Sequence, residues 1–303
     1  MSASVTLMDR AQYAALRLLV IVMRLVPFRV AGAVGAVVGR LGYAPFGIRR
    51  SVVDAQLAAA FPELDAAARR RIARESYENL GRVAIETTLV SVLPADRVLR
   101  LFDAPTGWEH VADALAAGRG LLLISGHLGN WELGAAYLAA RGVPIDAVAR
   151  HMNNPLMDGY VARSRRRLGV TVLFDDVAAP RIPRSVRAGR AVALLADQDA
   201  KGLVSTFVPF FGRLARTPKG PAVFALRLGV PAILAMVVRE ATGQYRMHFE
   251  PVPVRDTGDR DRDVDGIVTA YTAQMEAVIR RYPGQYLWHH KRWKRRPPEA
   301  PAA

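Results

Sequence analysis

Residues 121 to 132 read Leu121-Leu-Leu-Ile-Ser125-Gly-His-Leu-Gly-Asn-Trp-Glu132. The first residues form a short, continuously apolar run, which is typical of a strand that is buried on both faces. Two glycines then supply a flexible turn, and a helix is expected to begin near Asn130. The stretch therefore predicts a buried strand, a turn that carries His127, and a helix whose first turn carries Glu132.

The same pattern of apolar run and helix-length segment continues along the chain. The further apolar runs are Ile145–Ala149, Val170–Phe174, Ala191–Ala196 and Ala232–Val238. The helix-length segments beside them are Trp131–Arg141, Pro155–Leu168, Pro183–Ala188 and Pro218–Leu228. Continuous apolar strands that alternate with helices predict an α/β fold with a mostly parallel central sheet flanked by helices.

The remaining segments extend this arrangement on both sides. Asp65 caps a predicted helix that runs to about Val92, and a shorter helix begins near Trp108. Tyr245–Phe249 reads as an edge strand, and an apolar stripe from Ile267 to Val278 predicts a final helix. The charged stretch 255–265 is expected to be an exposed loop. The chain contains no linker that forces a division of this part into two domains.

The composition limits the classes of function. The chain has 303 residues, 42 Lys and Arg against 27 Asp and Glu, a formal net charge of +15, and no cysteine. A hydrophobic fraction of 51% excludes a disordered chain, and the lack of cysteine excludes disulfides and a thiol nucleophile. The positive charge suits an anionic partner: nucleic acid, an anionic membrane, an acidic carrier protein or a phosphorylated substrate.

The N-terminal segment is both apolar and basic. Its apolar runs are interrupted by arginines and by Pro27, and the longest uncharged run is half of the about 20 residues that a spanning helix needs. Arg10, Arg17 and Arg24 fall on one helical face. We therefore expect residues 1–45 to form a helical segment that associates with the membrane surface, and residues 46–303 to form the main domain. An ordinary amphipathic helix docked on that domain is the alternative.

The chemistry is expected at the carboxyl ends of the strands, where open α/β sheets bind their ligands. Across a strand-to-helix turn the chain can bend back, so that Glu132 bonds one imidazole nitrogen of His127 and leaves the other as a base. A purely structural pair of the two residues is equally compatible with this spacing.

Other site chemistries lack their motifs. The sequence contains no G-x-S-x-G elbow, no H-E-x-x-H motif, and no P-loop or G-x-G-x-x-G fingerprint. The adjacent His289 and His290 face different ways, so we expect no metal site and no cofactor. A base without a nucleophile of its own can instead deprotonate a substrate hydroxyl and direct it at an activated acyl group.

Several blocks of the sequence resemble those of a known family. The stretch 126–132 is similar to the first block of the lipid A late acyltransferases, the lauroyl and myristoyl transferases of lipopolysaccharide synthesis. Further blocks follow in the same order and cover essentially the whole chain: 149–158, with an arginine at a strand end; Leu195-Ala-Asp-Gln-Asp199; Phe207-Val-Pro-Phe-Phe-Gly212 with Thr217; and Tyr286-Leu-Trp-His-His-Lys-Arg-Trp-Lys-Arg-Arg-Pro297.

The resemblance implies an acyltransferase on the cytoplasmic face of the bacterial inner membrane. It implies transfer of a fatty acyl chain from acyl carrier protein, or from a coenzyme A thioester, to a hydroxyl of a lipid A precursor, which is a phosphorylated glycolipid. Since the sequence offers a base but no nucleophile, we expect this transfer to proceed without a covalent intermediate. The resemblance assigns the general base to His127 and the acid that orients it to Glu132. The residues expected to bind substrate are Asn130, Trp131, Arg150, Arg165, Asp197, Phe210 and Thr217.

Other functions stay open at this point. Mycobacterial acyltransferases of phosphatidylinositol mannosides share the general pattern, so the acceptor can be another glycolipid or a lysophospholipid. The mixed aromatic and basic residues of Trp288–Arg296 also suit a protein that only binds anionic lipid or nucleic acid. No nucleic-acid-binding signature accompanies them, and we expect no nucleic-acid partner.

Overall fold

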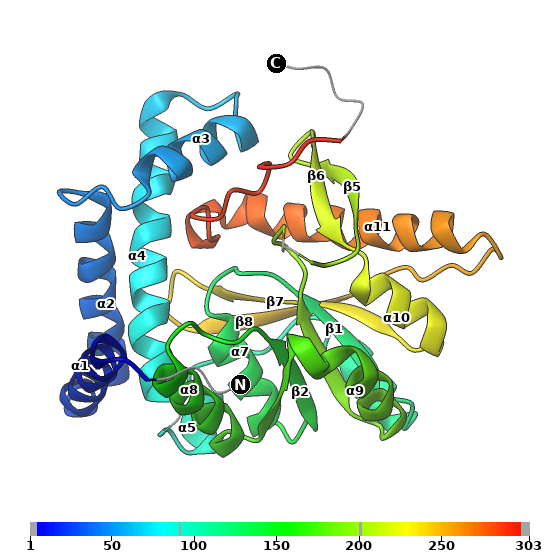
Figure 1. Ribbon diagram of the computed structural model, residues 1–303, viewed down its shortest axis with the longest axis horizontal. Coiled ribbons are helices and arrows are strands. Elements are labelled where there is room, and N and C mark those ends of the chain that lie inside the picture. The colour runs from blue at the N-terminus through cyan, green and yellow to red at the C-terminus, as the bar shows by residue number, and fades with distance from the viewer. Residues whose placement is uncertain (1–4, 91, 200–201, 298–303) are drawn as a thin grey trace.

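The computed structural model describes residues 5–90, 92–199 and 202–297, and a sheet with helices on both faces forms its centre (Figure 1). In these residues six strands pair in the order β3-β2-β4-β1-β7-β8. All neighbours are parallel except β7 and the edge strand β8, which are antiparallel. The strands are β1 (Leu121–Ser125), β2 (Ile145–Ala149), β3 (Val170–Phe174), β4 (Ala191–Leu195), β7 (Ala232–Arg239) and β8 (Tyr245–Pro251). The predicted mostly parallel α/β sheet is confirmed.

Helices precede, separate and follow these strands. The helices before the sheet are α1 (Leu7–Met23), α2 (Phe28–Tyr43), α3 (Arg50–Ala60), α4 (Ala66–Val90), α5 (Ala95–Leu99) and α6 (Trp108–Ala116). Those between and after the strands are α7 (Trp131–Ala140), α8 (Pro155–Arg167), α9 (Asp175–Arg187), α10 (Gly220–Leu228), α11 (Arg260–Arg281) and the short 3₁₀ helix η1 (Pro283–Gln285).

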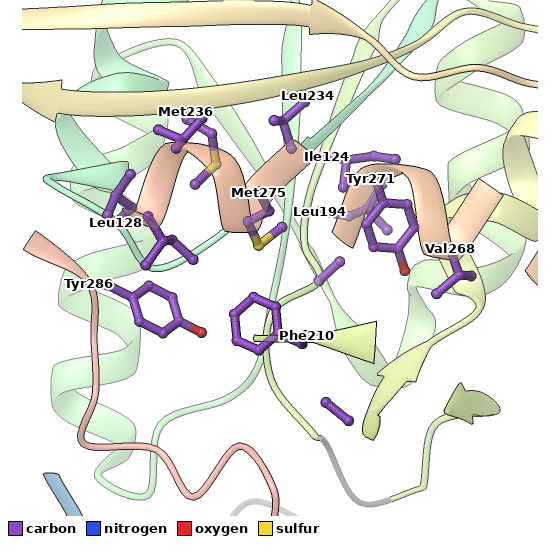
Figure 2. Packing of buried hydrophobic residues seen from close by; sticks show 14 of the residues in the cluster. Ile124, Leu128, Leu194, Phe210, Leu234, Met236, Val268, Tyr271, Met275 and Tyr286 are labelled. Atoms are coloured by element: carbon purple, nitrogen blue, oxygen red, sulfur yellow. The ribbon is translucent and has the colours of Figure 1, made fainter. Parts of the chain in front are cut away.

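Alternate residues of each strand face two different cores. On β1, Leu122 and Ile124 pack with residues of α9, α10 and α11, whereas Leu121 and Leu123 pack with residues of α6 and α7. Figure 2 shows the first core, in which strand residues such as Ile124 face Tyr271 of α11. Since both faces are covered, an uninterrupted apolar run is what each strand requires.

Two segments differ from the predictions. The prediction of a loop over 255–265 is wrong from Arg260 onward, because α11 begins there with Asp259 as its N-cap. Asp263, in the first turn of this helix, is buried and accepts hydrogen bonds from Thr257. Acidic residues stabilise a helix N-terminus, so they mark its start. An antiparallel hairpin of β5 (Ser205–Phe210) and β6 (Arg213–Pro218) was not predicted. The helix predicted from Pro183 begins earlier, at Asp175.

The N-terminal helices lie against α4 (Figure 1). On α1, Val20 and Met23 are buried, whereas Leu18, Ile21 and Val22 are exposed beside the arginine face. The apolar side chains that α1 exposes are therefore different from those that it packs against the protein. On α2 an outer stripe of valines and Leu41 is also exposed. In the described part of the chain no helix has the length and apolar character needed to cross a membrane.

Glycines allow α2 and α4 to pack backbone to backbone. A Cβ atom added at Gly81 of α4 would lie 2.1 Å from the carbonyl oxygen of Gly35, and one added at Gly39 would lie 2.0 Å from that of Tyr77. Only glycine permits such an approach. This glycine seam, formed by Gly35, Gly39 and Gly81, fixes α2 to the rest of the protein.

Candidate active site

His127 lies on the turn between β1 and α7, as predicted. Two glycines shape this turn: a Cβ at Gly126 would lie 3.3 Å from the side chain of Asp197, and one at Gly129 would lie 2.1 Å from the carbonyl oxygen of Val237. Gly129 also has φ of +58°, a conformation that favours glycine. The turn is therefore built to bring the imidazole close to the neighbouring strand.

That neighbour is β4, and it supplies the partner of the histidine. The register pairs Ser125 with Leu195 at the carboxyl ends of β1 and β4, so His127 and Asp197 each follow their strand by two residues. His127 Nδ1 lies 2.8 Å from Asp197 Oδ1, and the His127 backbone N–H donates to Asp197 Oδ2 over 3.0 Å. A carboxylate only accepts hydrogen bonds, so Nδ1 carries the proton.

This tautomer leaves the other ring nitrogen as an acceptor. Among the described residues Nε2 of His127 has no hydrogen-bond partner, and the side chain is 21% exposed. A neutral imidazole held at Nδ1 and open at Nε2 is the arrangement that general-base catalysis requires.

The electrostatics of the pair favour its charged forms. Burial lowers the pKa of His127, but the Asp197 carboxylate, helped by Glu132, outweighs it and raises that pKa above the usual value. Burial would raise the pKa of Asp197, but the imidazole and the hydrogen bonds from His127 lower it to about 2. Asp197 is therefore a carboxylate throughout the physiological range and stabilises an imidazolium beside it.

Glu132 has a different partner from the one expected. Its two carboxylate oxygens accept hydrogen bonds from Nε and Nη2 of Arg165 on α8, the first over 2.9 Å. The prediction that Glu132 orients the imidazole through a hydrogen bond is therefore corrected: the chain turns the histidine toward β4. The bidentate pair is three-quarters or more buried, and Arg165 faces inward while Arg163, Arg166 and Arg167 are exposed.

Asn130 caps α7 and is held in turn by a buried carboxylate. Its side-chain oxygen accepts from Leu133 N, and its Nδ2 donates to Glu86 of α4 over 2.8 Å. The hydroxyl of Tyr245 also donates to Glu86, whose pKa is raised by burial. Sequence reasoning missed Glu86, although an acid between the buried Ile85 and Leu89 was a visible signal.

The other side of the turn is fixed by backbone contacts. Leu287 N donates to the carbonyl oxygen of His127, and Gly129 N donates to that of Gln285, both over 3.0 Å. The Asn79 side chain donates to the carbonyl oxygens of both Gly129 and Gln285. The position of His127 thus depends on α4 and on the segment after α11.

An apolar cavity of about 70 Å³ lies between the sheet and α7, next to this turn. Trp131, Glu132 and Arg165 line it near the turn, and Trp131 also packs against the His127 ring with 4.8 Å between ring centroids. Farther in, the lining consists of small and apolar residues, including Ala147, Ala193, Ala235, Leu138, Val237 and Met247.

The remaining predicted substrate residues lie elsewhere. Arg150 is exposed and pairs with Asp175 over 3.0 Å. Phe210 is buried in the core on the opposite face of the sheet from the cavity. Thr217, also buried, accepts a hydrogen bond from Arg292 over 2.6 Å. The structure does not bring these three into the cavity lining. In the described residues no group of His, Asp and Glu side chains is arranged to hold a metal.

Comparison with known proteins identifies the family of this chain. The family model described as bacterial lipid A biosynthesis acyltransferase matches residues 4–295. The chain is 28% identical over 274 residues to the lipid A biosynthesis palmitoleoyltransferase of Escherichia coli K12, covering 89% of this chain and 87% of that protein.

Two other relatives show the range of the family. The lipid A biosynthesis lauroyltransferase of Escherichia coli K12 is 28% identical over 278 residues, covering 91% of this chain and 89% of that protein. The phosphatidylinositol mannoside acyltransferase of Mycolicibacterium smegmatis is 30% identical over 186 residues, 60% of this chain and 58% of that protein. Since the family model spans almost the whole chain, the protein is an acyltransferase that belongs to the bacterial lipid A biosynthesis acyltransferase family.

Proposed function

We propose that this protein transfers a fatty acyl chain from a thioester donor to a hydroxyl of a lipid A precursor. The observation that carries the proposal is the His127–Asp197 pair, whose imidazole is open at Nε2 beside an apolar cavity. Trp131 lies between the imidazole and the cavity, because it contacts the His127 ring and also lines the cavity.

The reaction is a single displacement. Nε2 of His127 accepts the proton of the acceptor hydroxyl while that oxygen attacks the thioester carbonyl. The carbon–sulfur bond then breaks, and the imidazolium returns its proton to the departing thiolate. Asp197 stabilises the imidazolium, as the acid does in a serine-protease triad. No side chain of the protein becomes acylated, so the histidine begins and ends the cycle neutral.

Glu132 and Arg165 contribute through charge and position. Glu132 helps to raise the pKa of His127, and it holds Arg165 near the outer end of the cavity. The first turn of α7, with Trp131 and Glu132 at its start, supplies backbone amides and a positive dipole end for the oxygen of the tetrahedral intermediate. The apolar cavity next to them, with a volume of about 70 Å³, has room for only the first few methylene groups beyond the carbonyl.

The donor that fits this protein best is acyl carrier protein. Arg163, Arg166 and Arg167 of α8 are exposed on the helix whose Arg165 reaches the cavity. Such a basic surface attracts an acidic carrier and steers its thioester toward the site. A coenzyme A thioester is the alternative donor, and the assay below compares the two directly.

The proposed place of action is the cytoplasmic face of the bacterial inner membrane. The helices α1 and α2 present exposed apolar side chains, with Arg10, Arg17 and Arg24 beside them on α1 and after its end. This combination suits a pair of helices that lie in the headgroup layer, with apolar side chains inserted and guanidinium groups at the phosphates.

A second acceptor class is supported by one comparison. The mycobacterial relative is named for phosphatidylinositol mannoside, so another glycolipid is the alternative acceptor. The chemistry proposed for His127 is the same for either acceptor, because both present a hydroxyl to an acyl thioester.

The test is an assay of the purified protein in detergent with matched acyl carrier protein and coenzyme A donors. A lipid A precursor and a phosphatidylinositol mannoside are offered as acceptors, and the products are identified by mass spectrometry. We expect transfer to the lipid A precursor, and a loss of about 10²–10⁴-fold in His127→Ala. Near-normal turnover in His127→Ala, or no acylated product with any acceptor, contradicts the proposal.

A further inference from the structure

A second hollow, of about 330 Å³, lies outside the site described above. It is lined by α4, by the end of β7 and by the segment that joins α11 to η1, and three arginines contribute to it: Arg82, Arg239 and Arg281. None of its lining residues lines the apolar cavity. The ligand of this hollow can therefore be considered separately from the acyl chain.

The three guanidinium groups are not bonded to any carboxylate of the described residues. In the described part of the chain, the side chains of Arg82, Arg239 and Arg281 form no hydrogen bond or ion pair, and Arg239 bonds the Gln285 side chain only through its backbone. Burial and the nearby positive charge of Arg239 lower the pKa of Arg82. Burial and nearby like charges both disfavour a charged guanidinium group, and an anion bound in the hollow would offset both effects.

The acidic residues of the hollow do not neutralise these groups. Glu78 is engaged by Arg40 of α2 at 2.7 Å. Glu75 packs against Gly284, and a Cβ atom added at Gly284 would lie 2.3 Å from the Glu75 carboxylate. Burial raises the pKa of Glu75. Glu86 lies outside the lining and attracts Arg82 and Arg239, but its hydrogen bonds are with Asn130 and Tyr245. With Glu78 occupied, the lining offers three guanidinium groups against one carboxylate that bonds none of them.

The chemistry of the ligand follows from the donors. Guanidinium groups bind phosphate oxygens through paired, charge-assisted hydrogen bonds. A volume of about 330 Å³ is about ten times the volume of a water molecule, so a phosphate group fits with its substituents or with water. The same α4 packs along α2, whose outer side carries exposed valines.

We propose that the hollow formed by Arg82, Arg239 and Arg281 is a binding site for a phosphate group. The phosphate belongs either to the headgroup of an anionic lipid or to a free phosphate ion, and the experiment separates these sources. Phosphate binding in this hollow requires neither His127 nor the apolar cavity, so it is tested separately from acyl transfer. Asn79 and Gln285 of the lining also hold the turn that carries His127, and the variants below leave both unchanged.

The experiment compares the full-length protein with two double variants of equal charge. Arg239→Gln/Arg281→Gln removes two arginines of the hollow, and Arg184→Gln/Arg187→Gln removes two exposed arginines of α9. Inorganic phosphate is titrated calorimetrically in one arm. In the other arm, the protein is floated with phosphatidylcholine vesicles that do or do not contain phosphatidylglycerol.

The two arms have distinct expected outcomes. A lipid headgroup site predicts that the hollow variant loses its preference for phosphatidylglycerol vesicles by about tenfold or more, whereas the α9 variant changes only slightly. A site for the free ion predicts that inorganic phosphate binds the wild type and the α9 variant but not the hollow variant. Identical behaviour of the two variants in both arms overturns the proposal.

Thermal unfolding of each variant is measured first, and Arg281→Gln alone is the fallback if the double variant is unstable. Arg281 is exposed at the end of α11, so its replacement leaves the core intact. In that single variant a reduced phosphate response supports the site, and an unchanged response in both arms contradicts it. Acyl transfer is assayed separately, so a failure of the catalytic proposal does not affect this result.

Discussion

At the scale of single residues, the site depends on which carboxylate holds the histidine. Asp197 accepts from both the ring Nδ1 and the backbone N–H of His127, whereas Glu132 is occupied by Arg165. The two acids therefore have separable roles. One fixes the tautomer of the base, and the other supports the electrostatic potential around it and holds an arginine at the cavity.

The Asp197→Asn variant tests this division. Its maximal rate is expected to fall by about 10²–10⁴-fold, because the imidazolium loses its stabilising charge. The base must be neutral to act, so the rate rises as pH rises through the pKa of His127. That pKa is raised by Asp197, so the variant's acidic limb should move to lower pH.

The measurement is the pH dependence of kcat/KM for the wild type, Asp197→Asn and Glu132→Gln. Glu132 acts on the histidine only through space and contributes less to its pKa, so Glu132→Gln should move the limb less. A larger displacement in Glu132→Gln than in Asp197→Asn would reverse the assignment of the two acids.

At the scale of secondary-structure elements, the apolar cavity is enclosed by α7 and the middle of the sheet. Ala147 of β2 lines it, with Ala193 beside it on β4. Short side chains at these places leave room above the strands. The length of acyl chain that the enzyme accepts is therefore expected to depend on the size of a few strand residues.

We expect Ala147→Leu to shift the preference toward shorter acyl chains. Every methylene group that is excluded from the cavity loses about 0.8 kcal/mol of burial. A long and a short acyl donor are offered in competition, and mass spectrometry of the products gives the ratio of long-chain to short-chain transfer. Ala116→Leu, on an exposed position of α6, is the control, and an unchanged ratio in Ala147→Leu contradicts the assignment of the cavity.

The glycine seam between α2 and α4 gives a prediction about stability. In Gly81→Ala the new methyl group would meet the carbonyl oxygen of Gly35, and overpacking of this kind costs about 1–3 kcal/mol. Gly266, exposed in α11, has open space around it, so Gly266→Ala should stabilise the protein by up to about 1 kcal/mol. Equilibrium denaturation measures the free energy of unfolding of the two variants. Equal effects of both substitutions would show that α2 is not closely packed on α4.

The sequence predicted the central sheet well because each buried strand is an apolar run whose signal is local. The prediction from sequence failed where a feature depends on residues that lie far apart in the chain. The pairing of His127 with Asp197 joins two strand ends 70 positions apart, whereas the spacing of His127 and Glu132 suggested a nearer partner. Pro209 and Arg213 in the β5–β6 hairpin interrupted the apolar pattern. The charged residues at the start of α11 were interpreted as a loop, although their acids are typical of a helix N-terminus.

At the scale of the whole molecule, the exposed apolar side chains are concentrated on α1 and α2. On α2 they follow one side, Val30, Val34, Val37, Val38 and Leu41, while the glycine seam occupies the other. Because α2 is packed so closely on α4, removal of residues 1–45 would also uncover α4. Substitution of the outer side chains is therefore the cleaner test of membrane contact.

The triple variant Val34→Thr/Val37→Thr/Val38→Thr keeps the shape of each side chain and changes only its polarity. Full burial of one valine contributes about 1.5–3 kcal/mol, so binding to vesicles should weaken by at least about tenfold. Sedimentation with vesicles at low and high salt measures the bound fraction of the wild type and of the variant. High salt should weaken attachment of the wild type without releasing it, since salt screens only the arginines.

Three exposed valines outside the N-terminal helices provide the matched control: Val92, Val177 and Val204. Their replacement by threonine should leave vesicle binding unchanged. Equal binding of both triple variants would mean that the membrane contacts another surface of the protein.

The pairing of His127 and Asp197 also has a consequence for folding kinetics. The base is oriented only when β1 and β4 are side by side, and parallel pairing across a long loop is among the slower events in folding. A collapsed intermediate with its helices formed would still lack the oriented imidazole. Recovery of enzymatic activity during refolding should therefore lag behind recovery of helical circular dichroism, and the length of that lag reports when the two strands join.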